Sequence, residues 1–239
     1  MSSITTSSSS IDHIEIIKKR LCKQLLGNLK TDQSLKMSHP IIESMNTTDP
    51  QKCGSWPDID YHDTSRTHWQ PAKHLIRLAT MSRTYALTGS FNELLQINLG
   101  LEYFLNSAEG TCQNWWYNYI YTPRIIGDIL ILITSNCNFK EELLPSLQAA
   151  VKVCTNVNLK TINYTSANLM DSISNLIKAA CVMKSKDLML ACTSKIFSEI
   201  KVEEHLNREG IQVDDSFHQH GSQQAILSYG LVHSNLLTS

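Results

Sequence analysis

Residues 71–105 read PAKHLIRLATMSRTYALTGSFNELLQINLGLEYFL, and this stretch contains the signals for two consecutive helices. Pro71 suits the first turn of a helix, and Gly89 suits the position just after its end, where glycine readily adopts a left-handed conformation. Ser90 and Glu93 have the spacing of a capping box, which predicts that a second helix begins there. Because the linker is so short, we expect the two helices to be antiparallel neighbours.

Helical periodicity recurs on both sides of this pair. We expect further helices at about 10–26, from residue 122 onward, and at about 140–154, 167–184 and 187–202. Ser10 is a suitable cap for the first of them, Thr122 and Pro123 suit a cap and first turn, and Pro145 fits only as a kink or as a new start.

The stretch 28–69 contains prolines and many small polar residues, so it predicts a long loop with one helical turn near residues 41–45. No stretch shows a convincing β-strand alternation. The sequence therefore predicts an all-α chain of about seven helices in antiparallel pairs, closer to an α/α solenoid or toroid than to a four-helix bundle.

Length and composition exclude several classes of protein. The 239 residues are 42% hydrophobic, enough for a substantial core, and the net charge of -1 gives no basic field for nucleic acid or an anionic membrane. Seven scattered cysteines without a C-x-x-C motif indicate neither a zinc site nor a disulfide framework. We expect residues 1–10, rich in serine and threonine, to be a mobile lead-in without an export signal, and residues 11–239 to form the folded part.

The stretch 209–230 gathers histidines, carboxylates and a tyrosine between glycines. His218 and His220 form an H-x-H pair that could supply two metal ligands, but the sequence offers no matching third and fourth ligand, and two hydrogen-bonded histidines near a turn remain the alternative. His220 and Tyr229 would point to opposite sides of a regular helix or strand. If they act together, the backbone between them must bend, which Gly221 and Gly230 allow.

The densest aromatic cluster is Asn114-Trp115-Trp116-Tyr117-Asn118-Tyr119. Both tryptophans could be core residues, but neighbouring positions on a helix point about 100° apart, so one face cannot bury both. The functional interpretation is a groove lined by flat aromatic rings that stack on sugars. Asn168 opens a helix with Asp171 one turn later, which fits either an N-cap or an amide donor for an anionic substrate group.

Several of these segments resemble polysaccharide lyase family 8, the hyaluronate, chondroitin AC and xanthan lyases. The stretch from Asn114 to Pro123 is similar to the family's N-W-W-x-x-x-I-x-x-P, and Thr165 to Asp171 to its T-G-A-N-x-x-D. Residues 209–221, followed by Tyr229-Gly230, resemble its E-G-x-Q-x-D-x-S-[FY]-x-Q-H-[GT] and Y-G elements, and Ser55-Trp56-Pro57-Asp58 also fits. The sequence departs from the family's usual residues at Tyr119, Ser166, Leu169 and Ser222, none of them a proposed catalytic position.

The resemblance implies an incomplete α/α toroid and a carbon-oxygen lyase that cleaves acidic polysaccharides by β-elimination, without metal or organic cofactor. Asn168, His220 and Tyr229 match its catalytic residues. Asn114, Trp115, Trp116 and Gln219 match substrate-binding positions. The resemblance also implies an extracellular location. From the charge balance we expect no nucleic-acid or membrane partner, and the oligomeric state stays open.

In the family, arginines and β-sheet domains follow the tyrosine, so residues 11–239 correspond to the N-terminal part of the lyase domain. Because Tyr229 then lacks a cation that favours its phenolate, we expect this polypeptide alone to have weak or no lyase activity. The alternative is a catalytically inactive, carbohydrate-binding helical module that retains the aromatic patch.

Overall fold

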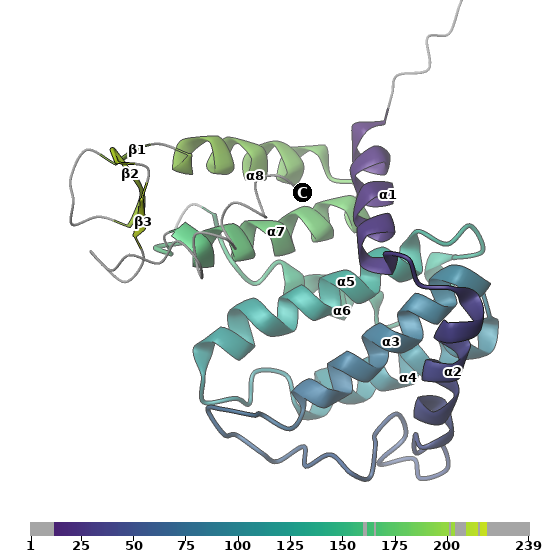
Figure 1. The fold of residues 1–239 in the computed structure, drawn as a ribbon. Helices are drawn as coiled ribbons and strands as arrows, with labels where there is room; N and C mark the ends of the chain where they lie inside the picture. Colours follow the sequence, from purple (N-terminus) through teal and green to yellow (C-terminus); the bar gives the residue numbers. More distant parts are fainter. Residues whose placement is uncertain are drawn as a thin grey trace, which may run out of the picture.

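The computed structural model describes residues 12–159, 162–164, 166–200, 202–203, 209–214 and 216–218. This part of the chain contains eight α-helices and one small sheet (Figure 1). The helices are α1 (His13–Leu26), α2 (Thr31–Glu43), α3 (Ala72–Thr88), α4 (Phe91–Ser107), α5 (Thr122–Thr134), α6 (Leu147–Cys154), α7 (Ser166–Met183) and α8 (Lys186–Glu199). The all-α prediction is confirmed, and among the described residues no helix is both long and apolar enough to cross a membrane.

The expected pair α3 and α4 is confirmed, together with its local signals. Gly89 has a left-handed backbone (φ 67°), and its N–H donates to the carbonyl oxygen of Tyr85 at 2.8 Å. The side chain of Ser90 accepts from the backbone N–H of Glu93, as a cap should. Glu93 does not complete the capping box, because its carboxyl group turns inward and accepts from the hydroxyl of Ser38 on α2 at 3.2 Å.

The prediction of a long loop over residues 28–69 is wrong for its first third, where the structure has α2. The buried face of this helix carries serines instead of large apolar side chains. Ser34 is fully buried, with its Oγ 2.6 Å from Thr84 Oγ1 on α3. Ser38 is equally buried against Glu93. Polar contacts to another helix leave no apolar periodicity, so a search for amphipathic stripes misses this element.

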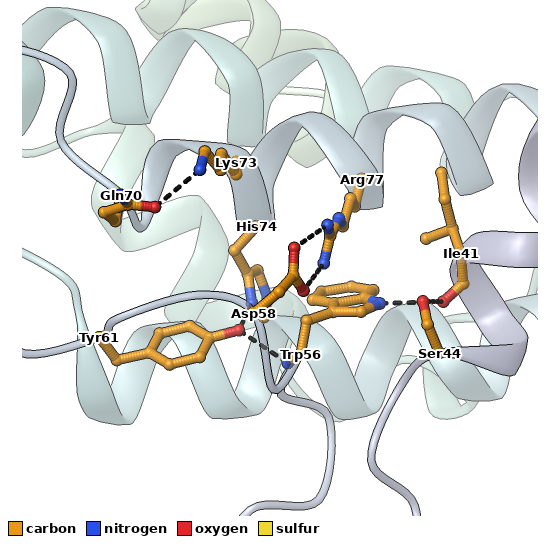
Figure 2. A network of polar contacts seen from close by, with 9 residues as sticks. All are labelled: Ile41, Ser44, Trp56, Asp58, Tyr61, Gln70, Lys73, His74 and Arg77. Carbon is orange, nitrogen blue, oxygen red and sulfur yellow. Dashed lines mark hydrogen bonds and ion pairs between the residues drawn. The ribbon is translucent and has the colours of Figure 1, made fainter.

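The rest of the long loop is fixed to the α3–α4 pair by a buried histidine (Figure 2). His74 on α3 is fully buried, and its Nε2 lies 2.8 Å from the carbonyl oxygen of Gly100 on α4. A carbonyl can only accept, so Nε2 carries the proton and Nδ1 accepts from the hydroxyl of Tyr61 at 2.8 Å. The backbone N–H of Trp56 in turn donates to Tyr61 Oη at 3.0 Å. One chain of hydrogen bonds therefore joins the loop to both helices.

The first helix begins later than expected, because Asp12 rather than Ser10 caps it by accepting from the N–H of Ile14 at 3.1 Å. Lys18 on α1 is 5% exposed, and its ammonium group donates to the carbonyl oxygen of Thr134 at the end of α5. A cation at this end of a helix is favourable, so the contact anchors α1 on the core. The expected mobile lead-in, residues 1–10, lies outside the described residues.

The region after α5 also differs from expectation. The structure has a 3₁₀ turn, η2 (Glu141–Leu143), and then the short helix α6, which begins two residues after Pro145. Pro145 therefore fits the alternative of a new start and not that of a kink within one helix. Beyond α8, three short strands, β1 (Val202–Glu203), β2 (Gly210–Gln212) and β3 (Phe217–His218), form a sheet in which β2 pairs parallel with β1 and antiparallel with β3. The expectation of no strands is wrong here, because strands of two or three residues are too short to show an alternating pattern.

Helix α5 lies at the centre, with nine buried positions, and packs against α1, α3, α6 and α7. Figure 1 shows α7 and α8 side by side, with α1 across one end of the pair and the small sheet beyond the other. Since α8 runs back along α7, it ends beside the start of α7. The sheet therefore follows directly from the end of the molecule where Asn168 lies.

Candidate functional site

The aromatic cluster begins at a capped helix start. Asn114 Oδ1 accepts from the backbone N–H of Trp116 at 3.1 Å, while its Nδ2 donates to the carbonyl oxygen of Arg66 at 3.1 Å. Both ends of this amide are thus engaged with the backbone. Asn114, predicted to bind substrate, holds the start of the helix that presents the tryptophans.

This helix contains a π-helical turn, η1 (Tyr117–Tyr121), and continues without a break into α5. Pro123 explains the turn, because proline has no N–H and its ring collides with the carbonyl group four residues earlier, that of Tyr119. Asn175 on α7 is buried, and its Nδ2 donates to the carbonyl oxygen of Ile120 inside the turn at 3.1 Å. The expectation that Thr122 caps a new helix is wrong, since Thr122 is buried within a helix that is already running.

The two tryptophans point to different surroundings, as their adjacent positions predict. Trp115 is 44% exposed, and its ring centre lies 5.3 Å from that of Tyr164, just before α7. Trp116 packs against Tyr121, with ring centres 5.6 Å apart, and the guanidinium carbon of Arg124 lies 5.5 Å from its ring centre. The patch is therefore two clusters, one uncharged and one beside a cation.

Arg124 connects the Trp116 cluster to α7. Its Nη1 lies 3.7 Å from Oδ1 of Asp171, a residue only 8% exposed. Burial raises the pKa of Asp171, and the positive charges of Arg124 and then Lys178 act against this rise. Farther along α7, Lys178 forms an ion pair with Asp128 of α5 at 2.6 Å. A polar seam of two ion pairs thus joins α5 and α7, and it begins beside Trp116.

Asn168 lies inside the first turn of α7, which begins at Ser166. The N-cap alternative is therefore wrong, because that position precedes the helix. Asn168 is partly exposed. Its backbone carbonyl oxygen, not its side-chain amide, accepts from the hydroxyl of Ser172 at 2.9 Å.

Both clusters reach the start of α7. Trp115 does so through Tyr164, two residues before the helix, and Trp116 through Arg124 and Asp171. Asn168 falls between these two contact points along the chain. The predicted Asn114, Trp115, Trp116 and Asn168 are thus gathered at one end of the α5–α7 pair. Gln219, His220 and Tyr229 lie outside the described residues.

His218 is buried at the end of β3, with Nε2 3.3 Å from the hydroxyl oxygen of Ser216. Within the described part of the chain, no three His, Cys, Asp or Glu side chains come together as a metal site. All seven cysteines are free.

Two members of the site were not among the residues predicted from the sequence. Arg124 directly follows the Thr-Pro pair, and Tyr164 stands just before the Thr-Ser-Ala-Asn segment. Their types are suitable for an acidic glycan, a cation for its charge and a ring for its sugars. Their contacts with the tryptophans depend on how α5 packs against α7, which no local pattern shows.

Comparison with known proteins shows which family this arrangement resembles. Residues 22–237 match the N-terminal α-helical domain of polysaccharide lyase family 8. Chondroitinase-AC of Pedobacter heparinus is 29% identical over 224 residues, which are 91% of this chain and 30% of that enzyme. This chain therefore spans less than a third of the length of that relative.

Solved structures give the same result. A chondroitinase AC lyase, studied in complexes with oligosaccharides, superposes with a TM-score of 0.80 at 26% identity, covering 94% of this chain and 32% of that one. Xanthan lyase of Paenibacillus superposes with a TM-score of 0.70 at 18% identity, covering 95% and 22% of the two chains. The expected fold, an incomplete α/α toroid, is confirmed.

Proposed function

Since the chain belongs to polysaccharide lyase family 8, as its N-terminal α-helical domain, we propose that it carries part of the active site of a lyase that cleaves uronic-acid-containing polysaccharides. The substrate class is a glycan of the hyaluronan, chondroitin or xanthan type. The reaction is a β-elimination, in which a proton leaves C5 of the uronate and the glycosidic oxygen at C4 departs. The chain corresponds to 30% of the Pedobacter enzyme, so the proposal concerns its contribution to the site.

The chemistry suits the proposed residues. The C5 proton is only weakly acidic, so its removal requires donors that stabilise the negative charge moving onto the carboxyl group. The amide of Asn168 would donate to that group, and His220 would help to hold the uronate. Tyr229 would take the C5 proton as a phenolate and return a proton to the leaving oxygen. A phenolate requires nearby positive charge, because the ordinary pKa of tyrosine is about 10.

One observation carries the proposal, namely the gathering of two aromatic clusters and Asn168 at the start of α7. Aromatic rings bind sugar faces, and an amide at the same place can reach a carboxylate of the bound sugar. Exposed Trp115 is free to stack on a ligand. Arg124 adds a cation beside Trp116, which suits an acidic polymer.

The test uses the whole polypeptide that the gene encodes, incubated with hyaluronan, chondroitin sulfate and xanthan. We expect the ultraviolet absorbance of an unsaturated uronide with at least one polymer. The product should be lost in Tyr229→Phe and strongly reduced in Asn168→Ala. Asn92→Ala, an exposed asparagine on α4, serves as the control. No product from any polymer, or product formation that survives both substitutions, contradicts the proposal.

A second function is a catalytically inactive module that binds acidic polysaccharide. It is favoured by the exposed aromatic patch, which is complete without the catalytic residues. This function requires binding without product, weakened in Trp115→Ala and Trp116→Ala. Binding that both substitutions leave unchanged excludes the aromatic platform. For either function we propose an extracellular location, where polymeric glycans are accessible.

A further inference from the structure

A hollow of about 170 Å³ lies beside Trp115 and is separate from the polar seam between α5 and α7. Its lining includes Tyr119, Asn156, Asn158, Ile162, Asn163 and Tyr164. Three asparagines and two tyrosines thus surround a small depression at the edge of the aromatic patch.

The fold builds this hollow from segments that are distant in the sequence. Trp115 and Tyr119 are four residues apart, so they project from nearly the same side of the helix, and they are 44% and 46% exposed. The thiol of Cys154, at the end of α6, contacts the carbonyl oxygen of Pro123 at 3.4 Å. This contact brings the loop after α6 over Tyr119. The loop is closed by a hydrogen bond from the N–H of Ile162 to the carbonyl oxygen of Asn158 at 2.9 Å.

The chemistry of the lining selects an uncharged polar ligand. None of the described residues that line the hollow carries a charged side chain. Amides donate and accept hydrogen bonds at once, as required by sugar hydroxyl and acetamido groups. Burial raises the pKa of Tyr164, so its phenol stays neutral and can also both donate and accept. Exposed rings of Trp115 and Tyr119 provide flat apolar surfaces for a sugar face.

The size of the hollow indicates how much of a ligand it holds. Sites for drug-sized molecules usually measure about 300–1,000 Å³. At about 170 Å³, this hollow suits a single ring of a longer chain. The opposite side of the patch, at Trp116, carries Arg124 and Asp171, so the two sides differ in charge.

We propose that this hollow is a sugar subsite for one uncharged unit, a hexose or N-acetylhexosamine, of a glycan whose acidic unit lies at Trp116 and the start of α7. The proposal deepens the function proposed above and rests on it for the acidic unit. It gives the two tryptophans different tasks, since Trp115 serves the uncharged unit and Trp116 the acidic one. A polymer that alternates acidic and uncharged sugars matches this arrangement.

Calorimetric titration of the chain with two probes tests the subsite. One probe is an uncharged trimer of N-acetylglucosamine, and the other is a hyaluronan hexasaccharide. Asn163→Ala and Tyr164→Ala remove lining groups, and Tyr164→Phe keeps the ring while removing the hydroxyl. Asn92→Ala and Phe91→Ala are controls, because both are exposed residues at the start of α4. Circular dichroism checks that each variant is folded.

We expect the lining variants to lose affinity for both probes, on the order of two- to tenfold for Tyr164→Ala, while the controls do not. The loss should be the same at low and high salt, because no charge is removed. Wild-type binding of hyaluronan without binding of the trimer, or lining variants that bind as wild type does, overturns the subsite. Tyr164-dependent binding of the trimer without binding of hyaluronan supports the subsite and contradicts the acidic substrate. Absence of binding to either probe contradicts both.

Discussion

The guanidinium group of Arg124 lies over the ring of Trp116, with its central carbon 5.5 Å from the ring centre. Its Nη1 lies 3.7 Å from Oδ1 of Asp171. An aromatic ring and a buried carboxylate thus hold one cation at the rim of the site. This side chain is 35% exposed, so it can still meet an anionic ligand. A second arginine has a similar arrangement elsewhere, since Arg77 lies 5.3 Å from the ring centre of Trp56 and pairs with Asp58.

The pair of arginines provides a matched test of the cation. Arg124→Gln should weaken binding of hyaluronan hexasaccharide by about tenfold, because a hydrogen bond to a charged group contributes about 1.5–3 kcal/mol. It should also reduce the salt dependence of binding. Arg77→Gln should change neither property. Fluorescence titrations at two salt concentrations measure both, and equal effects of the two substitutions would contradict a role for Arg124 in binding.

Asn175 should be needed for the stability of the π-helical turn. Asn175→Ala removes the donor to the carbonyl oxygen of Ile120 and leaves this buried acceptor unpaired, which should cost about 1–3 kcal/mol in the free energy of unfolding. Urea unfolding measures this cost. The near-ultraviolet circular dichroism of Trp115 and Trp116 should change as well. Asn92→Ala, on an exposed surface, should alter neither signal.

The carboxyl group of Glu93 has hydrogen bonds that fit its protonated form. Thr88 Oγ1 lies 2.9 Å from the carbonyl oxygen of Thr84 and 3.0 Å from Glu93 Oε2, yet it has one proton to donate. It also accepts from the N–H of Ser90 at 3.2 Å. If Glu93 is protonated, it donates to Thr88, and Thr88 donates to Thr84, so every group is satisfied. Burial likewise raises the pKa of Glu93, and this rise outweighs the opposing effect of the hydrogen bonds with Thr88 and Ser38 and of nearby His39.

Glu93 should therefore make the protein less stable as the pH rises. Because the folded-state pKa of Glu93 lies above its ordinary value of 4.5, the proton is bound more tightly in the folded state. Its stabilising contribution is complete below that value and is lost as the pH passes the folded-state pKa. Glu93→Gln, which stays neutral, should gain stability relative to wild type between pH 4.5 and pH 7.5. If the difference in unfolding free energy between wild type and Glu93→Gln stays constant with pH, a protonated Glu93 in the folded state is excluded. Glu142→Gln, at an exposed position, is the control.

His74 should have the opposite effect on stability, which it should make lower as the pH falls. Burial lowers its pKa from 6.5 to about 3, outweighing the hydrogen bond to Gly100, so the folded state holds a neutral ring. The unfolded chain takes up the proton below about pH 6.5, and wild type should lose on the order of 1.4 kcal/mol of stability for each pH unit below that value. His74→Gln, which can still donate to Gly100, should show a shallower dependence in urea unfolding from pH 6.5 to 4. Equal slopes would contradict the neutral assignment.

Local signals predicted the elements whose ends depend on neighbouring residues. Gly89 and Ser90 end one helix and begin the next through bonds to residues three or four positions away. Helix α2 was missed because Ser34 and Ser38 face partners on other helices, so its pattern has meaning only after packing. The π-helical turn was also missed, although Pro123 is its local cause. Its geometry is completed by Asn175, a partner from α7.

By itself, the sequence determined the all-α class, most helix positions and the identity of the aromatic and amide side chains. Helix ends are decided by capping bonds within a few residues, and such bonds leave a readable pattern. Only the tertiary structure decided that Trp115 meets Tyr164 and that Arg124 joins Trp116 to Asp171. These contacts form only when α5 packs against α7. That packing depends on buried surfaces and polar pairs contributed by distant parts of the chain, so no local pattern in the sequence shows it.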